Sequence, residues 1–154
     1  MSQQSQSPEP RGCDGCTLCC KIFPVEPLNK PANVLCTHCI ADTGCGIFGQ
    51  ASRPAVCGEF RCGYLMEPQL GPEWKPSVSH IVLLNEGLSM VAGVDADVPD
   101  AWRREPYYSV LRNWARIGGA NGANVMISTG SRLVQLMPDG SELAIRIANP
   151  KSAR

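Results

Sequence analysis

The sequence predicts an α+β protein in which a loop-rich, cysteine-bearing N-terminal part packs against a small antiparallel sheet with one main helix. Two observations lead to this fold class. All nine cysteines of the 154-residue chain lie between Cys13 and Cys62, and none follows. From Ser77 onward, short apolar stretches alternate with turn residues around a single helical pattern. A chain of this length can form one domain with a core of ordinary size, or two tightly joined subdomains.

The composition divides the chain into regions of different character. Residues 1–12 are polar and dotted with proline, which predicts a disordered tail. Residues 13–66 are rich in glycine, proline and cysteine, so their core would be thin and metal bonds would supply the missing folding energy. Residues 66–76 contain three prolines and predict a connector. Residues 77–148 have the pattern of a small α+β unit packed against the cysteine region, and we expect one compact domain overall.

The second half contains the regular elements. Residues 80–84 and 88–94 predict two strands joined in a hairpin. Asp100 could cap a following helix, and Pro106 suits its first turn. Gly118-Gly119 would end this helix, whose apolar residues recur at helical spacing and predict one buried stripe: Tyr107, Val110, Leu111, Trp114 and Ile117. Turn residues separate three further predicted strands: 125–129, 132–137 and 142–147.

Charge and hydropathy restrict the classes of partner. The formal net charge is zero and neither half of the chain is strongly biased, whereas proteins that bind nucleic acid usually carry a basic face. The N-terminus lacks the apolar stretch of a secretory signal, and no run of about twenty apolar residues predicts a membrane-spanning helix. We therefore expect a cytoplasmic protein with neither nucleic acid nor membrane as its partner.

This expected location determines how the cysteines are interpreted. In a reducing compartment, a dense cysteine pattern indicates metal or redox chemistry rather than structural disulfides. The odd number of cysteines also fits poorly with a fully paired set. In an exported protein, four disulfides and one free thiol would be the alternative interpretation.

The spacing of the cysteines is typical of metal ligands. Cys13, Cys16 and Cys19 repeat a two-residue spacer, which lets neighbouring thiolates reach one metal from a tight turn. Cys20 follows Cys19 directly, and adjacent side chains tend to point in different directions, so this turn could join two sites. Metal ions are the expected partners, and the predicted ligands are all nine cysteines: Cys13, Cys16, Cys19, Cys20, Cys36, Cys39, Cys45, Cys57 and Cys62.

Other residues near the thiols have supporting roles in this hypothesis. Glycines on both sides of Cys45 would permit unusual backbone angles and a close approach to a ligand. His38 could replace a cysteine as a ligand, but we prefer a role in orienting its loop by hydrogen bonding. Arg53, Arg61 and Lys21 are near enough in sequence to offset the negative charge of a thiolate centre, although Lys21 fits a solvated surface at least as well.

The order and spacing of these motifs resemble the CxxCxxCC proteins, also called YkgJ-like cysteine cluster proteins, which are described as zinc- or iron-chelating. The motifs that carry the resemblance are Cys13-x-x-Cys16-x-x-Cys19-Cys20, Cys36-x-His38-Cys39, Gly44-Cys45-Gly46-Ile47-Phe48, Arg53-Pro54, Cys57 and Cys62. The resemblance implies metal chelation. Eight cysteines are usual in that family, so the ninth leaves the assignment of ligands to sites open.

The ligand types leave several metals open. Zinc would favour two closed four-thiolate sites that use eight of the nine sulfurs, and it is preferred because the cysteines are evenly spread and the region needs cross-links. An iron–sulfur cluster, zinc together with a cluster, or a three-metal arrangement also fits the count.

The predicted function is metal chelation with a structural, storage or delivery role. The alternatives are an iron–sulfur redox or sensing protein, and an accessory domain of a metal-dependent enzyme. The chain shows neither a convincing acid–base pair nor a glycine-rich loop between a strand and a helix for a methyl donor. An enzymatic activity of its own is therefore the less favoured hypothesis.

Overall fold

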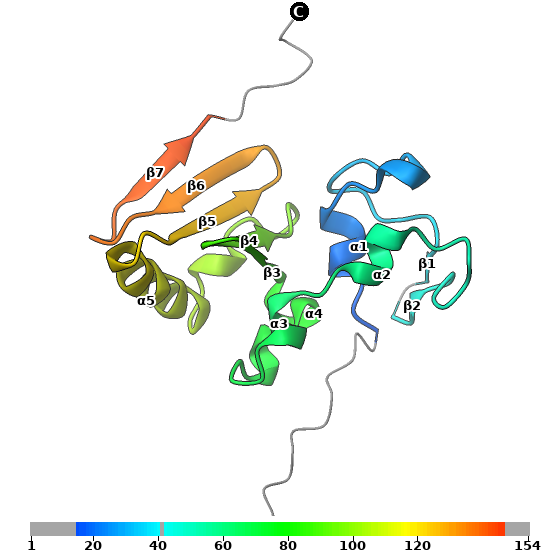
Figure 1. The fold of residues 1–154 in the computed structure, drawn as a ribbon, viewed down its shortest axis with the longest axis horizontal. Coiled ribbons are helices and arrows are strands. Elements are labelled where there is room, and N and C mark those ends of the chain that lie inside the picture. The colour runs from blue at the N-terminus through cyan, green and yellow to red at the C-terminus, as the bar shows by residue number, and fades with distance from the viewer. Residues whose placement is uncertain (1–14, 41, 147–154) are drawn as a thin grey trace, which may run out of the picture.

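The computed structural model describes residues 15–40 and 42–146 (Figure 1). Cys13, the predicted tail and the end of the last predicted strand lie outside the described residues. The elements in the cysteine region and the segment after it are α1 (Leu18–Ile22), η1 (Glu26–Leu28), β1 (Cys39–Ile40), β2 (Gly44–Cys45), α2 (Ala55–Glu59), α3 (Gly63–Met66), η2 (Pro72–Trp74) and α4 (Pro76–Ser79). The remaining elements are β3 (Ile81–Glu86), β4 (Ser89–Val94), η3 (Ala101–Arg103), α5 (Tyr107–Ala120), β5 (Asn124–Thr129), β6 (Arg132–Leu136) and β7 (Glu142–Ile145).

The main sheet has five strands in the order β3-β4-β5-β6-β7. Three of its four pairings are antiparallel, and β4–β5 is parallel. The helix α5 lies between these two strands in the chain, and such a crossover returns the chain to the same end of the sheet. The α+β class with one main helix is confirmed, and the sheet is mixed rather than purely antiparallel.

The helix α5 covers one face of the sheet through Tyr107, Leu111 and Ala115, which are spaced four residues apart and buried. Ile117 was predicted to belong to this stripe, but its side chain is 49% exposed. It stands two residues beyond Ala115 and therefore points to another side of the helix. Gly118-Gly119 does not end the helix. A Cβ atom at Gly119 would collide with the ring of Pro138, so glycine here permits close packing between the helix and the loop after β6.

The proline-rich segment predicted as a connector contributes to the core. Trp74 is 3% exposed, with its ring stacked on Trp114 at a centroid distance of 5.6 Å and edge-on to Tyr107 at 4.9 Å. The Tyr107 hydroxyl donates a hydrogen bond of 2.7 Å to the carbonyl oxygen of Glu73. This segment therefore belongs to the same core as the sheet and α5.

The strand β3 is buried on both faces. Leu83 belongs to the core under α5, whereas Val82, which is fully buried, packs with Leu18 and Ile22 of α1. Gly93 pairs with Val82 in the sheet, and a Cβ atom there would already lie 3.4 Å from Ile22. The cysteine-bearing part thus docks on β3 through α1 and also through α3, where Gly63 packs against Leu83.

An ion pair reinforces this docking. The Lys21 ammonium donates hydrogen bonds to the carboxylates of Asp95, at 2.7 Å, and of Asp97. Burial alone would raise the pKa of Asp95, but hydrogen bonds from Lys21 and from the Asp97 amide outweigh it, and the pKa is lowered. Lys21 therefore serves the contact with the sheet.

No helix within the described residues is long and apolar enough to cross a membrane.

We expect Asp95→Asn to lower the free energy of unfolding by about 1–3 kcal/mol, because it removes a buried charged partner of Lys21. Since the pKa of Asp95 is lower in the folded protein, its contribution is present above about pH 4 and disappears as the pH falls below that value. Urea denaturation at pH 7 and pH 3 would measure both effects. Asp97→Asn is the control, since that carboxylate is 79% exposed and its loss should cost less than about 1 kcal/mol. Equal losses of unfolding free energy in the two variants would contradict the role of Asp95 as the main partner of Lys21.

Candidate metal centre

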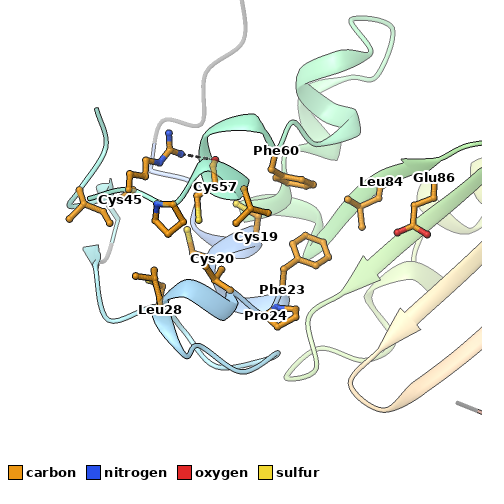
Figure 2. Close-up of a pocket in the computed structure, with 16 residues that line it drawn as sticks. Cys19, Cys20, Phe23, Pro24, Leu28, Cys45, Cys57, Phe60, Leu84 and Glu86 are labelled. Atoms are coloured by element: carbon orange, nitrogen blue, oxygen red, sulfur yellow. Dashed lines mark hydrogen bonds between the residues drawn. The ribbon is translucent and has the colours of Figure 1, made fainter. Parts of the chain in front are cut away.

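A cavity of about 340 Å³ lies between α1, α2 and β3 (Figure 2). Part of its wall consists of thiols, which come from α1, the loop before β1, β2 and α2. Figure 2 shows that the labelled cysteines gather at one end of this space. The cysteines that line the cavity are Cys19, Cys20, Cys36, Cys45 and Cys57.

The middle part of the cavity, between the thiols and the far end, is apolar (Figure 2). Phe23 and Phe60 face each other with ring centroids 5.3 Å apart, and Leu84 of β3 completes this wall. Glu86, also on β3, stands at the far end from Cys45 (Figure 2). The cavity therefore joins a wall of soft sulfur donors to an apolar surface of the sheet.

Backbone contacts bring the first two cysteine motifs together. The amide of Cys36 donates to the carbonyl oxygen of Cys20 at 3.1 Å, and the amide of Cys39 donates to the carbonyl oxygen of Cys36 at 3.0 Å. Cys39 and Cys45 are register partners in the short hairpin of β1 and β2. Cys39 thus joins the five cavity-lining thiols, and we call these six residues the cavity group.

Glycine determines the shape of this hairpin. A Cβ atom at Gly46 would lie only 2.9 Å from the carbonyl oxygen of His38, to which the Gly46 amide donates at 2.7 Å. The close approach predicted beside Cys45 is therefore made to the backbone of His38. The side chain of His38 is exposed and is not part of the cavity wall.

Two cysteines lie apart from the cavity group. Cys62 is 7% exposed and packs with Leu18, Ile22 and Val82 beneath α1. Burial raises the pKa of its thiol, and the charge of nearby Cys16 acts in the same direction. Cys16 is thus close enough to influence the Cys62 thiol electrostatically, while the structural place of Cys13 is outside the described residues.

The thiols share a space but do not converge on one point. Among residues 15–40 and 42–146, no three His, Cys, Asp or Glu side chains form a group that could hold a metal ion in the arrangement present. The eight described cysteines are also free of disulfide bonds. Coordination of a metal would therefore have to draw the sulfurs closer together.

Two cations accompany the thiols. Arg53 lines the cavity, donates from Nη2 to the carbonyl oxygen of Cys57 at 3.0 Å, and lies over the Phe48 ring at 4.6 Å. Its Nε atom is buried and has no hydrogen-bond partner in the described part of the chain. Arg61, also considered as a counter-charge, is exposed. An unpaired buried N–H group is costly, and a thiolate sulfur could satisfy it.

The second cation is Lys30, which the sequence did not single out. It is 7% exposed, and its ammonium donates to three carbonyl oxygens at the end of α1 and in the following loop. Burial lowers its pKa, while the charges of Cys36, Cys20, Cys19 and Cys57 oppose that shift. The only sequence signal is its position between Cys20 and Cys36.

The thiols differ in their tendency to ionise. A hydrogen bond with the Cys19 thiol, opposed by burial and aided by Cys39, Lys30 and Arg53, lowers the pKa of Cys20 to about 6. Burial raises the pKa of Cys39 and of Cys57. The cavity group therefore contains one thiol that ionises easily beside others that require a further positive charge, which a metal ion would provide.

Fold and site together define a cysteine-rich α+β protein with a thiol-lined cavity. A UPF0153 protein of Pseudomonas aeruginosa is 39% identical to this chain over 74 residues, an alignment that covers 42% of this chain and 88% of the relative. A UPF0153 protein of Vibrio cholerae is 38% identical over 53 residues, covering 32% of this chain and 65% of that relative. The chain belongs to the UPF0153 family, which is the cysteine-rich YkgJ-like family.

The comparisons support the resemblance at the level of a cysteine-rich family. No family model matches the chain, and no solved structure matches it. Each alignment covers less than half of this chain. The role of the remaining segments therefore has to be argued from this structure alone.

We expect Gly46→Ala to lower the free energy of unfolding by about 1–3 kcal/mol, because the added methyl group must displace the backbone of His38. The hairpin that positions Cys39 and Cys45 would move with it. Thermal or urea denaturation of the metal-free, reduced protein measures this effect. Gly58→Ala in α2 is the matched control, since the nearest atom to its new Cβ is a guanidinium nitrogen 3.9 Å away. An equal loss of unfolding free energy in both variants would show that the close approach of Gly46 to the His38 carbonyl is not the cause.

Proposed function

We propose that this protein binds metal through its cysteine thiolates, with zinc as the preferred ion and a structural, storage or delivery role. The observation that carries the proposal is the cavity group, in which five thiols from separate segments line one space, a sixth is joined to them through the backbone, and two cations lie beside them. Thiols buried only as small apolar side chains would not need a neighbouring ammonium and guanidinium. Thiolates do, because buried negative charge requires compensation. The metal would provide cross-links that the thin core of this region lacks.

We assign the nine proposed ligands to two centres. The cavity group supplies the first centre, and its six thiols exceed the four that a closed zinc site uses. Cys16 and Cys62 belong to the second, and Cys13 joins them because the two-residue spacer places it next to Cys16. In this division Cys19 and Cys20 belong to the same centre, and the boundary between the two sites falls between Cys16 and Cys19.

An iron–sulfur centre is the second candidate, and the size of the cavity favours it. A single zinc ion lies within its four thiolates and needs almost no free volume, whereas a cluster also holds inorganic sulfide. The space of about 340 Å³ beside the thiols leaves room for such a group. Soft thiolate ligands suit both centres, so the ligand type alone does not decide between them.

We expect the protein purified without oxygen to contain about two zinc ions per chain and to be colourless. Elemental analysis and ultraviolet–visible spectra would measure this. Cys62→Ser should remove about one ion, because its centre has no thiol to spare. Cys57→Ser should retain both ions, because the cavity group has six thiols for the four that one zinc site uses. His38→Ala is the control and should retain both ions, because its exposed side chain lies outside the cavity wall.

The other outcomes are equally informative. Iron with matching sulfide and a brown chromophore would establish the iron–sulfur candidate instead. Loss of metal from His38→Ala would make that residue a ligand. A metal-free protein with its thiols paired in disulfides would disprove the proposed function.

A further inference from the structure

Lys30 has an unusual environment for a lysine. Lysine is among the residues least often found buried, yet this side chain is only 7% exposed. It occupies the loop after η1, where the backbone of Val25 and Lys30 forms a bridge that turns the chain back toward α1. Its ammonium therefore lies inside the cysteine region rather than in solvent.

All three protons of this ammonium are held by the backbone. Nζ donates to the carbonyl oxygens of Lys21 at 3.0 Å, of Pro31 at 2.9 Å and of Phe23. Lys21 and Phe23 flank the end of α1, the helix that carries Cys19 and Cys20. The three carbonyls form a tether that keeps the positive charge next to these thiols.

Carbonyl oxygens satisfy the hydrogen bonds of an ammonium but do not neutralise its charge, and an isolated buried charge is costly. No salt bridge among the described residues includes Lys30. Four thiols lie near enough to act electrostatically on its ammonium: Cys36, Cys20, Cys19 and Cys57.

We infer that Lys30 is a fixed counter-charge of the thiolate centre at the cavity, tethered by three carbonyls so that it cannot turn away to solvent. The inference rests on the proposed function. A divalent metal ion bound by four thiolates has a net charge of −2, and the positive charges of Lys30 and Arg53 bring the total to zero. Such neutrality suits a site whose other wall consists of Phe23, Phe60 and Leu84.

Lys21 offers a matched control, because it belongs to the same helix and directly follows Cys20. Its ammonium pairs with Asp95 and Asp97 on the sheet side. Removal of this charge should weaken the docking of α1 without removing a counter-charge of the thiolates. The two lysines therefore separate an effect on the metal from an effect on the fold.

The test uses the full metal-loaded chain and follows transfer of its metal to an excess of a chromogenic chelator. We expect Lys30→Met and Lys30→Gln to lose metal roughly 10–100-fold faster than the wild-type protein. Glutamine keeps N–H donors for the carbonyl tether but lacks the charge, so equal effects of the two variants identify the charge as the cause. Lys21→Met should release metal at the wild-type rate although its unfolding midpoint falls.

Each contrary result has a distinct meaning. If Lys30→Gln released metal at the wild-type rate, the inference would be overturned, because the hydrogen bonds of residue 30 rather than its charge would then stabilise the site. Faster release from Lys21→Met, to the same extent as from Lys30→Met, would also overturn it and would indicate general loosening of α1. Wild-type protein that contains no metal would overturn the proposed function together with this inference, whereas metal-loaded variants with unchanged release would overturn the inference alone.

Discussion

The contact between α1 and β3 is the constraint on which the rest of the structure depends. Alternate side chains of a strand point to opposite faces, so an apolar run such as that of β3 must be covered on both sides. Leu83 is covered by the core under α5, and Val82 is covered by Leu18 and Ile22. The same five-residue helix carries Cys19 and Cys20, so the packing that completes the core of the sheet also positions two thiols at the cavity.

Local patterns predicted the elements of the second half because neighbouring residues determine them. The hairpin of β3 and β4, the helix after Pro106 and the strands β5 and β6 were all predicted close to their observed positions. The features that were missed depend on distant contacts. The parallel pairing of β4 with β5 follows from where α5 crosses the sheet, and the burial of Trp74 follows from its stacking on Trp114. Neither contact leaves a periodic signal in its own segment.

The candidate site, like the fold, combines features that local patterns predicted with features that depend on distant contacts. Cysteine identity and spacing indicated soft metal ligands, and the cysteines that are described do include a group around one cavity. The separation of Cys62 from that group could not be predicted, because it arises from packing under α1. Lys30 was missed because a lysine in a proline-rich loop has the composition of a surface residue. Only the fold shows that three carbonyls enclose its ammonium.

The two lysines near α1 link stability to the charge of the site. Lys21 directs its ammonium to Asp95 on the sheet, and its carbonyl oxygen accepts a hydrogen bond from Lys30 on the cysteine side. One residue therefore takes part in both the docking contact and the tether of the buried cation. The tether uses the backbone carbonyl of Lys21, whereas the docking contact uses its ammonium, so a substitution that removes only the ammonium leaves the tether in place. Cys19 links the two regions through its own side chain, since it lines the cavity and also packs against the buried residues under α1.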